Sequence, residues 1–120
     1  MTLTPQIYLS FNGQCEAAFR FYEQRLGATR GGMFPYANSP MAGDVPREWE
    51  AKIMHGSITL GGLTIAGADP PPGQYERPKG FRISIEMPIQ QTFWSVRFGV
   101  LTDQFGIPWT ISCSQAPTEV

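Results

Sequence analysis

The sequence predicts an α+β protein whose two halves use similar sets of strands. Three patterns indicate this fold class: apolar and polar residues alternate over residues 6–11, apolar residues recur at helical spacing over residues 15–26, and alternation returns over residues 93–101 and 107–113. Alternation is typical of half-buried strands, and a period near 3.6 is typical of a surface helix. A chain of 120 residues is expected to form one domain.

The first half opens with a strand over residues 6–11 and continues into a helix. Asn12 and Gly13 can serve as cap and breaker before this helix, and Gly27 can end it. One amphipathic helix is therefore expected. Its apolar stripe consists of Cys15, Ala18, Phe19, Tyr22 and Leu26.

Three further strands complete the first half. Residues 29–34 form a weaker strand, and residues 35–50 are rich in Pro, Gly, Asn, Ser and Asp, which predicts a long loop. Residues 51–60 return to a strand pattern, turn at Gly61-Gly62 and continue as a strand over residues 63–68. The predicted order is strand, helix and three strands.

The second half repeats the strands but not the helix. It follows a Pro-rich connector, residues 69–80, which contains three consecutive prolines that stiffen it. Residues 81–86 alternate as a strand, and the chain closes with the hairpin, whose turn contains Asp103 and Gly106. Asp supplies local hydrogen bonds and Gly tolerates unusual φ, as tight turns require.

Composition excludes several classes of protein. A formal net charge of −1 gives no basic surplus for nucleic acid, and 42% hydrophobic residues argue against disorder. No apolar run is long enough for a membrane span, and residues 1–8 lack the features of a secretion signal, so we expect a cytoplasmic protein. Cys15 and Cys113 have no metal-binding spacing and are expected to be free thiols.

Four segments carry a family resemblance. The hairpin contains Arg97-Phe98-Gly99 and then Thr102-Asp103-x-Phe105-Gly106-x-x-Trp109. The other segments are Tyr8–Gly13 leading into Cys15–Phe19, Trp49 through Lys52–His55, and Gly61–Leu63. Together they resemble, in the same order and over almost the whole chain, the PhnB-like branch of the vicinal oxygen chelate superfamily, which includes glyoxalases, bleomycin-resistance proteins and extradiol dioxygenases.

This resemblance implies paired βαβββ modules in a single glyoxalase-like domain. Module one would span residues 1–68, the connector residues 69–80, and module two residues 81–115. The resemblance also implies a homodimer and a pocket for a small-molecule ligand, with no nucleic-acid or membrane partner. It says much less about a reaction.

Module two lacks its crossover helix in the sequence as given. In the family a helix follows the strand that resembles residues 81–86, whereas here Glu86 is followed directly by Met87–Gln91, which resembles the strand after that helix. About twenty residues are therefore missing, and parallel strands need a connection of roughly a dozen residues or more. Either a mobile crossover is left out of the sequence as given, or the deletion is real and residues 81–86 run on, for example into a partner subunit as a swapped element.

Strand alternation predicts one polar face of the sheet that could bind a ligand. In residues 51–60, Met54, Ile58 and Leu60 share a face suited to helix packing, and Ile53, His55, Ser57 and Thr59 share the other. Such a polar face could simply meet water, but the resemblance favours a sheet that curls around a cavity. The candidate ligand-binding residues are Tyr8, Ser10, His55, Ser57, Arg82, Ser95, Arg97 and Thr110.

His55 is the only histidine and the one candidate for catalysis, either by acid–base chemistry or by metal ligation. A hydrogen-bonded structural role is the alternative. The metal-binding positions of superfamily enzymes correspond here to Tyr8 or Ser10, a residue near Ala66, Arg82 or Ser84, and Thr110. Since these do not form a convincing ligand set, we expect no catalytic metal and no other cofactor.

Three functions follow from these residues and from the resemblance. The first is a binding protein of the bleomycin-resistance kind, which needs no metal. The second is a metal-dependent lyase, isomerase or dioxygenase of the glyoxalase type. The third is a methyltransferase, which is disfavoured because no Gly-rich loop for S-adenosylmethionine follows the first strand.

Several other residues have a structural and a functional interpretation. At least two of the three tryptophans are expected in the core or at an interface, although a tryptophan could also stack on a flat ligand. They are Trp49, Trp94 and Trp109. Arg97 could bind an anion or form a salt bridge to Asp103 or Glu86. Cys15 lies in the first turn of the predicted helix, where the macrodipole would lower the pKa of its thiol. Because no second histidine or carboxylate supports it as a nucleophile, packing is its expected role.

Overall fold

The computed structural model describes residues 2–88 and 97–114. The chain separates into two compact units, Met1–Arg77 and Pro78–Val120, and the boundary falls within the Pro-rich connector. Each unit has its own sheet.

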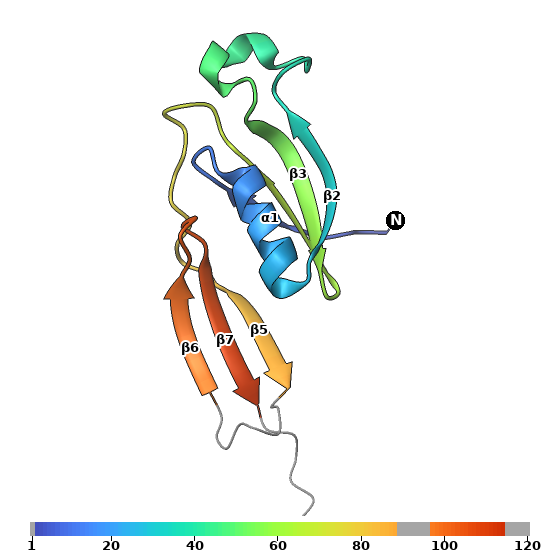
Figure 1. Ribbon diagram of the computed structural model, residues 1–120, viewed down its shortest axis with the longest axis vertical. Helices are drawn as coiled ribbons and strands as arrows, with labels where there is room; N and C mark the ends of the chain where they lie inside the picture. Colours follow the sequence, from blue (N-terminus) through green and yellow to red (C-terminus); the bar gives the residue numbers. More distant parts are fainter. Residues whose placement is uncertain (1, 89–96, 115–120) are drawn as a thin grey trace, which may run out of the picture. The chain divides into compact units, whose positions relative to one another are not determined.

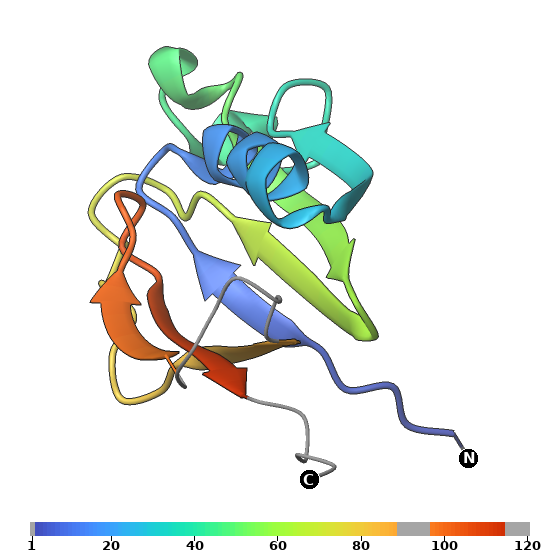
Figure 2. The ribbon, with the colours of Figure 1, turned by 60° about the horizontal axis from the view of Figure 1, so that its bottom comes forward.

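The first unit is a four-stranded sheet with a helix packed on one face (Figures 1 and 2). Strand β1 runs parallel to β4, and the β4–β3 and β3–β2 pairs are antiparallel. The predicted order of strand, helix and three strands is confirmed. The elements are β1 (Ile7–Ser10), α1 (Cys15–Leu26), β2 (Thr29–Pro35), β3 (Ile53–Leu60) and β4 (Leu63–Ala68), with short 3-10 helices at Ala42–Asp44 and Arg47–Trp49 in the predicted loop.

The core of this unit lies between α1 and the sheet. The fully buried apolar side chains include Leu9, Phe11, Phe19, Ile58 and Ile65. The rings of Phe11 and Phe19 meet edge to face, with centroids 5.5 Å apart. A Cβ at Gly67 of β4 would lie 2.9 Å from the Phe19 ring, so the helix approaches the sheet this closely only because Gly67 has no side chain.

The first turn of α1 is capped from a distant part of the chain. The residue at the N-cap position, Gln14, makes no side-chain cap, and neither Asn12 nor Gly13 supplies one, so the predicted cap is wrong. Instead, the Asp69 carboxylate accepts a hydrogen bond from the Cys15 N–H at 3.0 Å. At the other end Gly27 adopts the left-handed conformation (φ 75°), as predicted for the helix stop.

Asp69 also joins the ends of two strands. Its second carboxylate oxygen accepts a hydrogen bond from the Ile53 N–H at 3.0 Å, and its own N–H donates to the Ile53 carbonyl at 2.8 Å. The Tyr36 hydroxyl donates to the Asp69 carbonyl at 2.7 Å. Asp69 is only 1% exposed, and this burial raises the pKa of its carboxyl, whereas the backbone N–H donors and Lys52 act in the opposite direction.

The second unit is a three-stranded sheet of β5 (Ile83–Pro88), β6 (Arg97–Thr102) and β7 (Pro108–Ser114), in the order β5-β7-β6. Strand β5 is parallel to β7, and β6 is antiparallel to it. In the first unit β1 is likewise parallel to β4, and β3 is antiparallel to β4. The described strands of the second unit therefore correspond to β1, β3 and β4, and none of them corresponds to β2.

This arrangement corrects the assignment of Met87–Gln91 to the strand after a crossover helix, a range of which residues 89–91 lie outside the described residues. Met87 and Pro88 extend β5, so they do not start the strand that follows a helix. Pro88 pairs with Ser114, and Arg97 pairs with Cys113, so β5 ends and β6 begins at the same end of β7. A short connection can join strands at one sheet end, and the expected need for a long crossover does not apply here.

The turn between β6 and β7 is organised by Asp103, as predicted. Its carboxylate accepts hydrogen bonds from the N–H groups of Phe105 and Ile107 and, at 2.8 Å, from the indole N–H of Trp109. Gly106 donates its N–H to the Asp103 carbonyl and has a φ of 91°. Trp109 is buried, which agrees with a structural role for this tryptophan.

Replacing Asp69 with Asn is expected to lower the free energy of unfolding by about 2 kcal/mol, because the new amide group turns a donor towards buried N–H donors. Urea unfolding followed by circular dichroism measures this change. Asp44→Asn, at an exposed position, is the matched control and should change stability by less than about 0.5 kcal/mol. Equal effects of the two substitutions would contradict the role assigned to Asp69.

Candidate functional site

The side of the first sheet opposite α1 brings together the predicted residues of the first unit. The strand register places Tyr8 and Ser57 on either side of Ala66, and Ser10 beside Ala68. His55 pairs with Phe34 of β2. Because residues of the same phase share a face, Tyr8, Ser10, Phe34, His55 and Ser57 form one surface, called here the Tyr8–His55 face.

Aromatic groups dominate this surface. The rings of Tyr8 and His55 have centroids 6.2 Å apart and are tilted by 49°. Tyr8 is 57% exposed and Phe34 is 55% exposed, and His55 is also exposed. Partial burial raises the pKa of the Tyr8 phenol, so its hydroxyl stays a hydrogen-bond donor at neutral pH. The Tyr8–His55 face thus combines ring surfaces with hydroxyl groups that can donate or accept.

The alternation of β3 is less regular than the sequence predicts. Ile53 was expected to share the polar face with His55, but it is buried and lines a hollow beside α1. The pairing of β2 and β3 is irregular between Phe34 and Pro35, next to Ile53. A register irregularity of this kind changes which face a residue occupies, and simple alternation does not foresee it.

The candidate residues of the second unit do not form one set. Thr110 pairs with Ser84 on one side and Val100 on the other, and Arg82 is exposed just before β5. Arg97 is paired with Cys113, which puts its position out of phase with Thr110, so the expectation that they share a face is wrong. Ser95 and Trp94 lie outside the described residues.

The side chains present do not match a catalytic metal site. The positions that the family resemblance relates to metal ligands are Tyr8 or Ser10, a residue near Ala66, Arg82 or Ser84, and Thr110, and only a neutral or cationic side chain stands at each named position. Within residues 2–88 and 97–114 no three His, Cys, Asp or Glu side chains are grouped to hold an ion. His55 is therefore the one imidazole on a surface of hydroxyl and aromatic groups, which is a poor donor set for a divalent cation.

Cys15 is a buried thiol without nucleophilic character. Burial raises the pKa of the Cys15 thiol, and the nearby carboxylates of Asp69 and Glu16 raise it further. The expectation that the helix macrodipole lowers this pKa is therefore wrong, because desolvation and the capping carboxylate dominate at this helix end. Its side chain belongs to the core.

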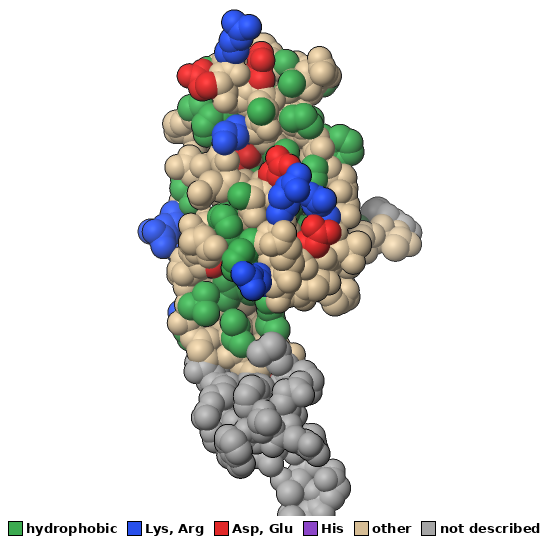
Figure 3. Space-filling view, viewed as in Figure 1, with side chains coloured by type: hydrophobic (Ala, Val, Ile, Leu, Met, Phe, Trp, Pro, Cys, Tyr) green, Lys and Arg blue, Asp and Glu red, His purple; other side chains and the backbone are tan. Residues whose placement is uncertain are grey.

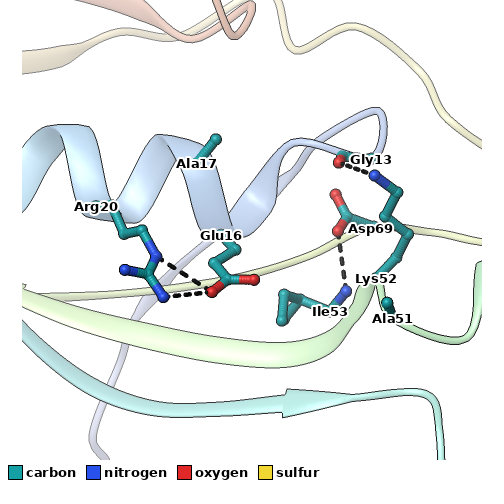
Figure 4. Close-up of a pocket in the computed structure, with 8 residues that line it drawn as sticks. All are labelled: Gly13, Glu16, Ala17, Arg20, Ala51, Lys52, Ile53 and Asp69. Carbon is teal, nitrogen blue, oxygen red and sulfur yellow. Dashed lines mark hydrogen bonds and ion pairs between the residues drawn. The ribbon is translucent and has the colours of Figure 1, made fainter.

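A concave region lies at the start of α1, on the helix side of the sheet. This hollow has a volume of about 370 Å³ and is lined by Gly13, Glu16, Ala17, Arg20, Ala51, Lys52, Ile53 and Asp69 (Figure 4). Its cationic groups already have protein partners: Lys52 donates to the Gly13 carbonyl at 2.9 Å, and Arg20 pairs with Glu16 at 2.7 Å. These contacts hold the helix end in place and leave little charge for a ligand.

The surface around α1 carries charges of both signs. In the view of Figure 3, acidic and basic side chains lie side by side over the helix. Charges of both signs so close together largely cancel at a distance, so this described side offers no continuous basic patch for an anionic polymer. No helix in the described ranges is long and apolar enough to cross a bilayer.

Replacing His55 with Ala should change the free energy of unfolding by less than about 0.5 kcal/mol, because the imidazole is exposed on the Tyr8–His55 face. Ile58→Ala in the same strand is the matched control, and as a buried core residue it should cost about 2–4 kcal/mol. Thermal or urea unfolding of both variants tests this placement. A large loss of stability in the His55 variant would show that its side chain is part of the core.

Cys15 should be protected from thiol reagents in the folded protein. In a Cys113→Ser background, labelling with a chromogenic disulfide reagent is expected to be on the order of 100-fold slower in buffer than in denaturing urea, because the thiol is buried and its pKa is raised. The Cys15→Ser, Cys113→Ser double variant gives the background signal. Rapid stoichiometric labelling of the native protein would contradict this assignment.

Comparisons with known proteins place this arrangement in a family. No family model matches the chain. YjdN of Escherichia coli K12 is 30% identical over 149 residues, an alignment that covers 99% of this chain and all of YjdN. Since this chain has only 120 residues and both chains are covered almost to their ends, YjdN contains internal residues that this chain lacks.

Solved structures agree with the sequence relative. PA1353 from Pseudomonas aeruginosa has a TM-score of 0.75 and 34% identity, and the match covers 96% of this chain and all of PA1353. The PhnB protein from Bacillus cereus has a TM-score of 0.72 at 16% identity, covering 93% of this chain and all of that protein, which shows a shared fold. The chain therefore belongs to the YjdN and PhnB-like family of glyoxalase-fold proteins.

Proposed function

We propose that this protein binds a small, flat molecule on the Tyr8–His55 face and does so without a catalytic metal. The observation that carries this proposal is the exposure of three ring systems among hydroxyl groups on one side of a sheet. Exposed aromatic rings offer apolar stacking surface, and nearby hydroxyl groups give orientation through hydrogen bonds. A flat ligand with one or two polar substituents uses both.

Each element of the proposed site has a defined role. The rings of Tyr8 and His55 would stack against the ligand, and Phe34, opposite His55 in the register, would extend the apolar surface. Ser10 and Ser57 lie on the same face and would supply hydrogen bonds. The proposal rests on the first unit alone, and Arg82, Ser95, Arg97 and Thr110 stay predictions from the sequence.

The metal-dependent alternative has less support from these residues. A glyoxalase-type enzyme needs several ionisable donors around one ion, whereas the Tyr8–His55 face supplies one imidazole. Metal analysis of protein purified without chelator distinguishes the two functions. A divalent metal bound in one-to-one ratio, and lost when His55 is replaced by Ala, would replace the proposed function with the enzymatic one.

Ligand binding should depend on Tyr8 and His55. We expect one- and two-ring aromatic compounds bearing a hydroxyl or carboxyl group to shift the amide signals of β1 and β3 in an NMR titration. Tyr8→Ala and His55→Ala should each weaken binding by about tenfold, the loss of one stacking contact. Gln24→Ala, exposed on α1, is the control and should have no effect. Signal shifts confined to α1, or equal losses in all three variants, would contradict the proposed site.

A further inference from the structure

The outer edge of β6 has no partner strand among the residues that the structure describes. In the first unit β3, the strand in the equivalent position, pairs with β4 on one side and β2 on the other. In the second unit β6 pairs with β7 and is the last strand in its sheet (Figure 1). An unpaired edge presents N–H and C=O groups that readily accept another extended strand.

The register shows which backbone groups point outwards from β6. The Asp103 N–H donates to the Ile107 carbonyl at 2.9 Å, so this residue pair is hydrogen-bonded. In an antiparallel ladder hydrogen-bonded and non-bonded pairs alternate, which makes the next pair, Thr102 and Pro108, non-bonded. Pro108 fits this position because it has no N–H. The backbone groups of Phe98, Val100 and Thr102 therefore face the free edge.

Apolar side chains accompany this edge. Val100 is 52% exposed and Leu101 is 44% exposed. A Cβ added to Gly99, the residue before Val100, would meet no atom within 4 Å, so open space lies beside the backbone at Gly99. An exposed strand of this kind, without a charged residue between positions 98 and 102, lacks the features that usually protect a sheet edge.

We propose that β6 is a docking edge for a second copy of this chain and that two β6 strands pair antiparallel about a twofold axis at Val100. Two features of β6 favour a second β6 strand as the partner. In this register Phe98 lies opposite Thr102, so the outward-facing backbone groups of the two strands match. Leu101 lies opposite Gly99, where there is open space.

The second unit has no described strand in the position that β2 occupies in the first unit. The relative YjdN contains internal residues that this chain lacks. Self-pairing of β6 places an extended strand in that position. The sheets of two copies would then form one continuous six-stranded sheet, in which β6 of each copy has two neighbours.

Cysteine cross-linking tests this register directly. In a Cys113→Ser background, Val100→Cys places two thiols on directly opposed residues, about 5.5 Å apart between Cα atoms, which suits a disulfide. Oxidised glutathione should therefore produce a covalent dimer. Thr102→Cys is the matched control on the same edge, and its two copies would be about 13 Å apart, so it should not cross-link. Efficient linking of the control, or none at Val100→Cys, overturns the proposal.

Sedimentation measurements test the dimerisation of the protein without an introduced cysteine. The protein, checked by its intact mass of 13.3 kDa, should dimerise reversibly between about 10 µM and 1 mM, because one strand pair buries a small surface. Val100→Pro removes an outward-facing N–H and should weaken dimerisation at least tenfold, whereas Val100→Thr keeps it and should not. A protein that stays monomeric throughout this concentration range, or equal dimerisation of the two variants, overturns the proposal. If Val100→Pro does not fold, the cross-linking experiment decides between the outcomes.

Discussion

The carboxylate of Asp69 holds together three segments that are far apart in the sequence: the end of β4, the start of β3 and the first turn of α1. It is buried, so its hydrogen bonds form without competition from water and leaving any of them unmade is costly. Because the helix has no local side-chain cap, its first turn depends on this distant group. Asp69 therefore fixes the start of α1 against the sheet, and the packing of Phe19 against Phe11 and Gly67 positions the rest of the helix.

The charged residues near Asp69 have structural roles, and the candidate functional residues lie on the other side of the sheet. Lys52, Arg20 and Glu16 surround Asp69 and use their charges on the protein itself. On the other side of the sheet Tyr8 and His55 contact each other and are open to solvent. The hollow lies on the helix side of the sheet. The exposed aromatic rings and hydroxyl groups that could bind a ligand lie on the Tyr8–His55 face.

Local patterns in the sequence predict most of the fold, because strand alternation, helical spacing and turn residues act over a few residues. They place Tyr8, Ser10, His55 and Ser57 correctly on one side of the first sheet. They fail where the outcome depends on pairing between distant strands. The role of Asp69 requires the end of β4 to meet the start of α1, and the phase of Arg97 relative to Thr110 depends on the register of the hairpin.

The hairpin of β6 and β7 has a consequence for how the second unit acquires its structure. Asp103 connects the turn to Trp109 within six positions, so these contacts form with little loss of chain entropy. Pairing of β5 with β7 joins residues that are much further apart in the sequence. Low contact order favours rapid formation, and the hairpin is therefore the natural nucleus onto which β5 is added later in folding.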